Sequence, residues 1–335
     1  MAVNAIFPET PIGKGMYESF YLRAVAPEEP LGAWLRYTVH KRPGHPPQGS
    51  LWCTIFDATR GAPFMHKHTT PLLTVPADGW IQIGEPQAEG GRLGPGAADG
   101  HCGPARWSLR IGQAEPELRH LKQSWLYRAP LPRTKLTSPA PAASFDGTIE
   151  LPERTIELRD WRGMVGHNWG AEHAERWIWL HGIDFVEDRS AWLDVAVGRV
   201  LLAGRLTPWL ASGAISFDGR RVRLGGLGAR GVQVAESPVR CSLTLPGEAG
   251  LLVQAHVDNP PGAAAGWRYA DPGTNDSEGR GSEHDVVNCS VASLSLNVRP
   301  HAAAARTLRT LHGAAYELGM RERDHGVALA PFDDG

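Results

Sequence analysis

Alternation of apolar and polar residues with a period of two runs through most of this chain. Clear examples are YESFYLRA (17–24), AWLDVAVGRV (191–200) and VVNCSVASLSLNV (286–298). Successive side chains of a β-strand point to opposite faces, so this period predicts half-buried strands. The segments are rich in valine, isoleucine, threonine and aromatic residues, and glycine, proline, aspartate or asparagine bounds them. The pattern predicts an all-β protein, a sandwich or barrel with little helix.

Two kinds of local signal refine this prediction. The FDG and DGRR pieces are typical of hairpin turns. HAAAARTLRTL (301–311) is the best candidate for a helix, although it is short. The long polar segment 259–285 is predicted to be a loop, and loops of that length are often functional.

The strand-like segments fall into two groups, one before about residue 160 and one after about residue 176. A chain of 335 residues is long enough for two ordinary domains. We therefore predict an N-terminal β domain over 1–165 and a C-terminal β domain over 166–335. The stretch GMVGHNWGAEHAERWIWLHG (163–182) lies where one group passes into the other, and binding sites are frequent at such junctions.

Charge and cysteine usage exclude several classes of function. The formal net charge is −2 and no dense Lys/Arg block occurs, which disfavours a nucleic-acid partner. No secretory signal pattern opens the sequence, and no apolar run approaches the roughly 18 residues of a transmembrane helix. The four cysteines form no CxxC pair, so we expect free thiols in a cytoplasmic protein. They are Cys53, Cys102, Cys241 and Cys289.

No cofactor is expected from the motifs. GLGARG (226–231) fits GxGxxG, but strand-like sequence flanks it on both sides. This context indicates a glycine turn rather than a nucleotide site. His66 and His68 would share a strand face, yet the glutamate that would complete a cupin-like metal site is missing. His167 and His173 are six residues apart, which matches neither helical nor strand ligand spacing. No metal site is therefore predicted.

One strand face gathers unusual side chains. From Arg176 the sequence alternates, so Trp177, Trp179 and His181 share a face. A short VEDR turn leads to a strand that carries Trp192 and Asp194 on one face. A core packed with tryptophans and a satisfied His–Asp contact is one interpretation. The glycines around HNWG, which could orient His167 and Trp169, favour a binding or catalytic site instead.

These residues, with YESFYLRA, LWCTIFD (51–57) and AAYELG (314–319), resemble the carotenoid 1,2-hydratase (hydroxyneurosporene synthase-like) and tocopherol cyclase-like proteins. The resemblance implies two lipocalin-like (calycin-type) antiparallel β-barrel domains packed around a hydrophobic cavity. It matches His167 and Trp169 to the His-x-Trp of the hydratases, and places Trp192 and Asp194 near their Tyr-x-Asp. Trp192 replaces the tyrosine, and Gly166 stands where many relatives carry an aspartate, so the fold is better supported than the reaction.

The predicted function is a cofactor-independent hydratase or cyclase/pericyclase acting on a hydrophobic isoprenoid- or polyketide-like molecule. Asp194, kept protonated by apolar surroundings, would supply the proton, and tryptophan π faces would stabilise a developing cation. The alternative is a non-catalytic lipocalin-like binding protein. The oligomeric state is left open. The predicted catalytic residues are His167, Trp169 and Asp194, and the predicted substrate contacts are Glu18, Asn168, Trp177, Trp179, His181 and Trp192.

Overall fold

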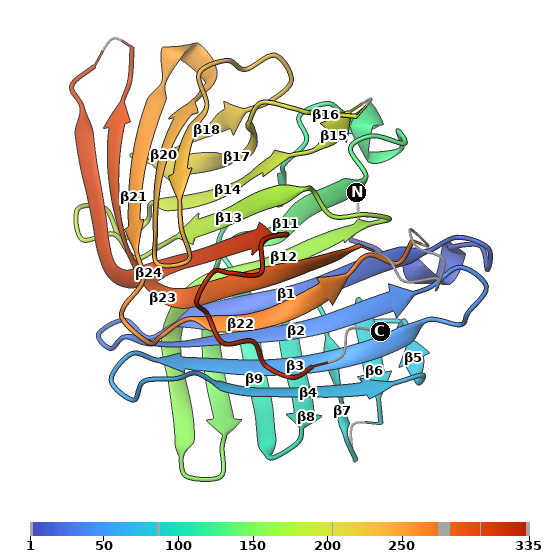
Figure 1. The fold of residues 1–335 in the computed structure, drawn as a ribbon. Coiled ribbons are helices and arrows are strands. Elements are labelled where there is room, and N and C mark those ends of the chain that lie inside the picture. Colours follow the sequence, from blue (N-terminus) through green and yellow to red (C-terminus); the bar gives the residue numbers. More distant parts are fainter. Residues whose placement is uncertain (1–2, 86–87, 203, 274–281, 302, 333–335) are drawn as a thin grey trace.

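The computed structural model describes residues 3–85, 88–202, 204–273, 282–301 and 303–332. In this part of the chain two large antiparallel sheets account for nearly all the regular structure (Figure 1). Among the described residues, helix is limited to three 3₁₀ turns, η1 (Phe7–Glu9), η2 (Ser124–Tyr127) and η3 (Glu248–Gly250). None of them could cross a membrane. The prediction of an all-β protein with little helix is confirmed.

The first sheet contains twelve strands in the order β4-β3-β2-β1-β12-β11-β9-β8-β7-β6-β5, with β10 beside β11. Its strands are β1 (Met16–Val25), β2 (Leu31–Lys41), β3 (Gln48–Asp57), β4 (Phe64–Thr70), β5 (Leu73–Thr74), β6 (Ile81–Gly84), β7 (Gly90–Leu93), β8 (Ala97–Cys102), β9 (Ala105–Gln113), β10 (Leu118–Arg119), β11 (Thr134–Glu150) and β12 (Thr155–Gly170).

The second sheet contains ten strands in the order β18-β17-β14-β13-β24-β23-β21-β20-β19, with β22 beside β23. Its strands are β13 (Arg176–Gly182), β14 (Trp192–Arg199), β17 (Leu210–Phe217), β18 (Arg220–Gly225), β19 (Gln233–Glu236), β20 (Arg240–Pro246), β21 (Leu252–Asp258), β22 (Ala265–Ala270), β23 (Glu283–Arg299) and β24 (Arg306–Met320). A separate hairpin joins β15 (Leu201–Leu202) to β16 (Arg205–Leu206).

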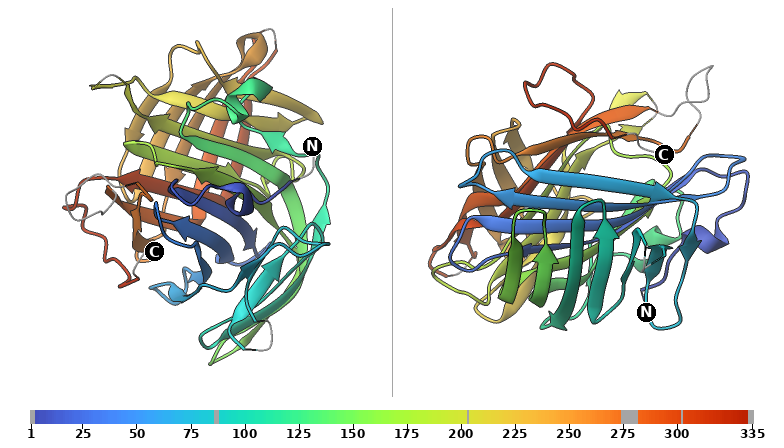
Figure 2. Two further views of the ribbon diagram at one scale, coloured as in Figure 1. Left: turned by 90° about the vertical axis from the view of Figure 1, so that its right-hand side faces the viewer. Right: turned by 90° about the horizontal axis from the view of Figure 1, so that it is seen from below.

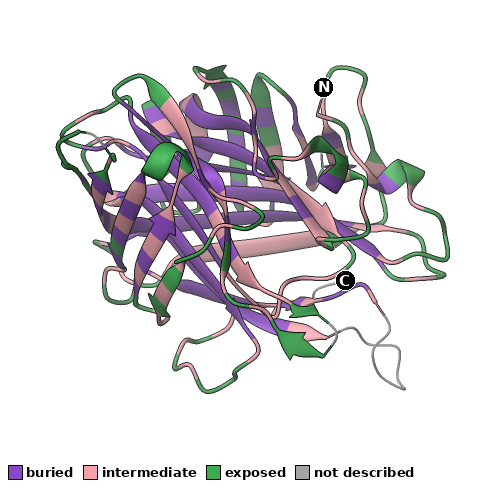
Figure 3. Cartoon of the chain, turned by 90° about the horizontal axis from the view of Figure 1, so that it is seen from above, coloured by how far each residue is buried: buried purple, intermediate pink, exposed green. Residues whose placement is uncertain are grey.

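The two sheets pack against each other, the first drawn blue to green and the second yellow to red (Figure 2). One face of the first sheet encloses its own core, which includes Phe20, Tyr37 and Val165. The opposite face contributes Trp34 and Trp52 to a core shared with the second sheet. Strands between these two cores are buried on both faces, as Figure 3 shows. HNWG ends β12, the last strand of the first sheet; the domain limits proposed above remain a prediction.

Three local predictions have clear outcomes. The turn at 217–220 is a hairpin turn in which Asp218 and Gly219 take positive φ values of 49° and 69°, as a tight two-residue turn requires. The FDG piece at 145–147 is instead a bulge within β11, where the register shifts between Phe145 and Gly147. GLGARG lies between β18 and β19 as a loop, as predicted.

The predicted helix at 301–311 is wrong. Residues from Arg306 onward form β24, which pairs with β23 along most of its length. Alanine is a strong helix former, but intrinsic propensity is a weak preference. Burial of Leu308, Thr310 and every residue from Gly313 to Met320 in the sheet outweighs it.

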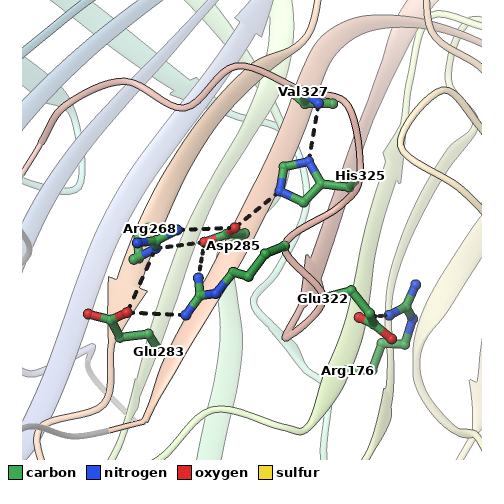
Figure 4. Close-up of polar contacts among 8 residues, drawn as sticks. Arg176, Arg268, Glu283, Asp285, Glu322, His325 and Val327 are labelled. Carbon is green, nitrogen blue, oxygen red and sulfur yellow. Dashed lines mark hydrogen bonds and ion pairs between the residues drawn. The ribbon is translucent and has the colours of Figure 1, made fainter.

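The C-terminal segment after β24 is held against the second sheet by a buried carboxylate. Arg268, Arg323 and His325 all contact Asp285, and Figure 4 shows Arg268, Glu283 and His325 around it. Burial alone raises the pKa of Asp285, but its bonds to Arg268 and His325 outweigh burial and lower it. The segment then continues to Phe332, whose ring meets Trp52 at 5.6 Å between centroids.

Candidate functional site in a cavity between the sheets

A cavity of about 810 Å³ lies between the sheets. Its volume is in the range of pockets that bind small molecules. Its walls come from β1, β2, β11, β12, β13, β14, β17, β22 and β24, together with η2 and the segment that follows it. The lining residues include the aromatic Tyr17, Tyr21, Trp34, Trp177, Trp179 and Tyr269, the aliphatic Val39, Leu126, Leu136, Ile178, Val197 and Leu210, and the polar Ser19, Arg36, Asn168, His173 and Glu317.

Strand alternation decides which predicted residues reach this cavity. In β12, Asn168 lies opposite Ser19 and faces the cavity, whereas His167 lies opposite Phe20 and faces the core of the first sheet. Trp169 shares the face of His167 and packs against Tyr127. Of the nine predicted site residues, Glu18, Asn168, Trp177 and Trp179 border the cavity. His167, Trp169, His181, Trp192 and Asp194 lie outside its lining.

His167 forms a closed structural pair with Glu18. Its Nε2 lies 2.7 Å from Glu18 Oε1, and its ring stacks on Phe20 at 3.9 Å. The same carboxylate accepts the backbone N–H groups of Ile6 and Phe7. Although Glu18 borders the cavity, its carboxylate is bound on the opposite side, so this pair fixes the N-terminal segment onto β1.

The hairpin of β13 and β14 has the register that would place His181 beside Asp194. The two side chains nevertheless find different partners. Nδ1 of His181 lies 3.1 Å from Arg23 Nη1, and Nε2 lies 3.0 Å from the carbonyl oxygen of Pro141. Arginine can only donate, so Nδ1 accepts and Nε2–H donates, which defines the neutral tautomer. Burial, followed by the charge of Arg23, lowers the pKa of His181 to about 4.

Asp194 is fully buried and richly bonded. It accepts hydrogen bonds from Ser138 Oγ and, at 3.1 Å, from Trp179 Nε1, and His120 Nε2 lies 3.3 Å away. Burial raises the pKa of this carboxyl, but His120, His181 and Ser138 together outweigh burial and lower the pKa to about 2. The prediction of a protonated Asp194 that donates a proton is therefore corrected: the group is an anion behind Trp179.

Trp177 and Trp179 lie two residues apart on the cavity face of β13, and each bonds to a carboxylate. Trp179 Nε1 donates to Asp194 on one neighbouring strand, and Trp177 Nε1 donates to Glu317 Oε1 at 2.9 Å on the other. An anion at the indole N–H increases the electron density of the ring. Both rings can therefore stabilise positive charge in the cavity.

Trp192, the third tryptophan of the predicted face, lies farther along β14. It is fully buried, and the guanidinium of Arg221 lies 5.0 Å from its ring. The guanidinium of Arg221 covers the Trp192 ring, which does not border the cavity, so Trp192 contributes to packing.

Gly166 leaves room for Tyr21, a lining residue of the cavity. A Cβ atom at Gly166 would lie 2.2 Å from the Tyr21 ring, so any side chain here would displace the phenol. Tyr21 in turn meets Trp179 edge-on at 5.4 Å. Gly166 thus allows the phenol of Tyr21 to form part of the aromatic wall of the cavity.

Sequence reasoning missed the histidine–carboxylate pair that borders the cavity. Nδ1 and the backbone N–H of His173 lie 2.7 and 2.8 Å from Asp271 Oδ1. Ser282 donates to the other oxygen at 2.6 Å. Burial raises the pKa of Asp271, but the bonds to His173 and Ser282 lower it overall. The two partners are 98 residues apart, and only the position of Asp271 in the segment 259–285 hinted at its role. The prediction of one long loop there is wrong in part, because β22 (Ala265–Ala270) pairs with β23, which begins at Glu283.

The ring of His173 is held by aromatic neighbours. It stacks on Tyr17 at 4.1 Å with an interplanar angle of 8°, and on Trp177 and Tyr269 at 5.2 and 5.6 Å. Because Nδ1–H donates to Asp271, Nε2 carries the lone pair. Within the described residues Nε2 has no hydrogen-bond partner, and His173 lines the cavity.

His284 brings a third potential metal ligand to this pair. One ligand atom each of His173, Asp271 and His284 lies within 4.8 Å of the others, so the three could hold a metal ion. Burial, followed by the nearby His173, lowers the pKa of His284 to about 3, which keeps the ring neutral. The Asp271 oxygens, however, already accept three hydrogen bonds from His173 and Ser282. That arrangement is typical of a carboxylate that orients a histidine.

Comparison with known proteins places the fold. No family model matches the chain. Two uncharacterized proteins of Mycobacterium tuberculosis, from strains CDC 1551 and H37Rv, are each 27% identical over 249 residues. The match covers 66% of this chain and 70% of each relative.

Solved structures give a wider match. An AttH-like protein of Nitrosomonas europaea superimposes with a TM-score of 0.52 and 12% identity, covering 95% of this chain and 97% of that one. CghA in complex with Sch210972 gives 0.56 and 12%, covering 91% and 88%. These likenesses show the lipocalin-like all-β fold. Membership of the carotenoid hydratase family itself remains a prediction.

Proposed function

We propose that this protein is a cofactor-independent enzyme of the hydratase or cyclase type, acting on a hydrophobic small molecule in the cavity between the sheets. The observation that carries the proposal is the shared position of two features. His173, which is paired with Asp271, and the two carboxylate-bonded indoles of Trp177 and Trp179 border the same cavity. His173 can move a proton, and the indole rings of Trp177 and Trp179 can stabilise positive charge.

The proposed chemistry needs only side chains. Nε2 of His173 accepts the proton of water or of a substrate hydroxyl as the oxygen attacks one carbon of a polarised double bond. The other carbon receives that proton from Nε2, so the sum is hydration or ring closure. Trp177 and Trp179 stabilise the positive charge at the attacked carbon. Asp271 is a positioning residue because it fixes the tautomer of His173. Asp194 is also a positioning residue, because it acts on the cavity through Trp179.

A non-catalytic binding protein is the second candidate. The ionised state of Asp194 favours it, because a strong acid within the cavity is what hydration of an isolated alkene would require. The two functions differ in whether His173 moves a proton.

A chromogenic probe tests this difference before the substrate is known. 5-Nitrobenzisoxazole is flat and apolar, and a base in an apolar cavity removes its C–H proton while its N–O bond breaks to give a coloured phenolate. We expect the purified protein to accelerate this reaction and His173→Gln to lower kcat by roughly 10²-fold. Asp271→Asn should lower kcat with little change in KM. The matched control is His256→Gln, because His256 is an exposed histidine bonded to Ser242.

Unchanged elimination in His173→Gln would leave the binding protein as the better account. A screen of hydrophobic alkenes and polyenes by liquid chromatography and mass spectrometry then identifies the reaction. Gain of one water indicates hydration, whereas an unchanged mass with altered retention indicates cyclisation. We expect Asp194→Asn to bind such substrates but turn them over more slowly by about 10²-fold, because it removes the charge behind Trp179.

A further inference from the structure

Arg36, a charged residue of the cavity wall, has no counter-charge within the part of the chain that the structure describes. Arg36 is 8% exposed and lines the cavity. Its guanidinium lies 4.8 Å from the Trp34 ring, 5.0 Å from Trp52 and 4.8 Å from Tyr269. No carboxylate of the described residues lies within ion-pair distance, and Nε and Nη1 have no hydrogen-bond partner there.

The nearby carboxylates are committed elsewhere. The charges of Asp194 and Glu317 both raise the pKa of Tyr21, which lies opposite Arg36 in the sheet. Asp194 accepts from Ser138 and Trp179, and Glu317 accepts from Trp177. Aromatic faces stabilise a guanidinium but accept none of its N–H groups along the usual fork. Buried N–H donors of an arginine without acceptors are costly, so a missing acceptor is indicated.

Other unpartnered polar atoms lie on the same face. Ser19 Oγ and Asn168 Oδ1 are buried without a partner among the described residues, and both residues line the cavity. Ser19 lies opposite Asn168 in β12 and opposite Thr38 in β2, two residues from Arg36 along that strand. Together they form a polar patch within otherwise apolar walls. Such a patch fixes the orientation of a ligand that carries a polar end.

We propose that Arg36 binds an anionic group, a carboxylate or an enolate, on the hydrophobic molecule that the cavity accepts. The proposal rests on the proposed function in that it assigns the substrate class of the same cavity. Arginine matches a carboxylate through two parallel N–H bonds, and the aromatic box keeps the guanidinium in place for them. Tyr269 contacts both Arg36 and His173, so the anionic end would lie near the proton-transfer pair. The apolar body would then extend over Trp177 and Trp179.

A matched pair of fluorescent polyenes tests the proposal. cis-Parinaric acid and its methyl ester have the same apolar chain, and only the acid carries a negative charge at neutral pH. We expect the protein to bind the acid at least tenfold more tightly than the ester. Arg36→Met should weaken binding of the acid about 10- to 100-fold and leave the ester unchanged. Arg36→Lys should keep part of the preference, because it retains the charge without the fork.

The control is Arg199→Met, since Arg199 also stacks on a tryptophan, Trp209, but lies outside the cavity lining. It should bind both probes as the unmodified protein does. Equal affinity for acid and ester, or loss of both probes together in Arg36→Met, would overturn the proposal while leaving a hydrophobic cavity. Failure of the unmodified protein to bind either probe would overturn the proposed function as well.

Discussion

Two histidine–carboxylate pairs lie close together along the chain and differ in what surrounds them. His167 meets Glu18, and His173 meets Asp271, both at 2.7 Å. The His167 side chain is 3% exposed and faces the core of the first sheet, whereas that of His173 is 14% exposed and borders the cavity. The N–O distance is the same in both pairs, although His167 pairs through Nε2 and His173 through Nδ1. Access of His173 to the cavity therefore distinguishes the candidate catalytic pair from the structural one.

The largest expected effect is on the closed pair. Glu18→Ala leaves His167 and the N–H groups of Ile6 and Phe7 buried without their acceptor, so the free energy of unfolding should fall by about 3–5 kcal/mol. Asp271→Ala should cost less, about 1–2 kcal/mol, because water can enter the cavity side. Denaturant unfolding monitored by tryptophan fluorescence measures both. Glu153→Ala, whose side chain is 82% exposed, is the control and should have little effect. Equal losses for the two pairs would contradict the comparison.

A second prediction concerns how the free energy of unfolding depends on pH. The folded pKa of His181 is about 4, below the unfolded value of about 6.5. The unfolded chain therefore binds this proton more tightly, and the contribution of His181 to stability is present above pH 6.5 and lost as the pH falls toward 4. The loss should amount to about 3 kcal/mol over that window. Unfolding at a series of pH values should show a shallower slope for His181→Gln. A slope identical to that of the unmodified protein would mean that His181 is not held neutral by burial.

A smaller effect is expected at the glycine beside His167. The added Cβ in Gly166→Ala meets the Tyr21 ring and should lower the free energy of unfolding by about 1–3 kcal/mol. The same variant should weaken binding of the methyl ester of cis-parinaric acid, since Tyr21 forms part of the cavity wall. Gly13→Ala, where a Cβ atom meets nothing within 4 Å, is the control. Unchanged stability and binding would show that Tyr21 moves aside freely.

The sequence carried more information about strands than about the site. Period-two alternation identified the sheet architecture, because burial of alternate residues is local and periodic. It also placed Trp177 and Trp179 on one face, where the structure has them. It could not say which face of β12 meets the cavity, so His167 was favoured over Asn168.

The remaining site residues depend on contacts between distant parts of the chain. Asp271 reaches His173 across 98 residues, and nothing local to either residue predicts that contact. The ionised state of Asp194 likewise depends on His120 and Ser138, which come from the first half of the chain. In the sequence, Arg36 resembles any charged residue of a strand, and only the packing of the two sheets places it in the cavity wall.

Chemical modification of the two histidines tests the central comparison most directly. Diethyl pyrocarbonate acylates an accessible, unprotonated ring nitrogen, and peptide mass spectrometry locates the product. The account expects His173 to be modified at Nε2, to be protected by saturating cis-parinaric acid, and His167 to stay unmodified under the same conditions. Modification of His167 with His173 unreactive, or modification of His173 that the bound probe does not slow, would contradict the account.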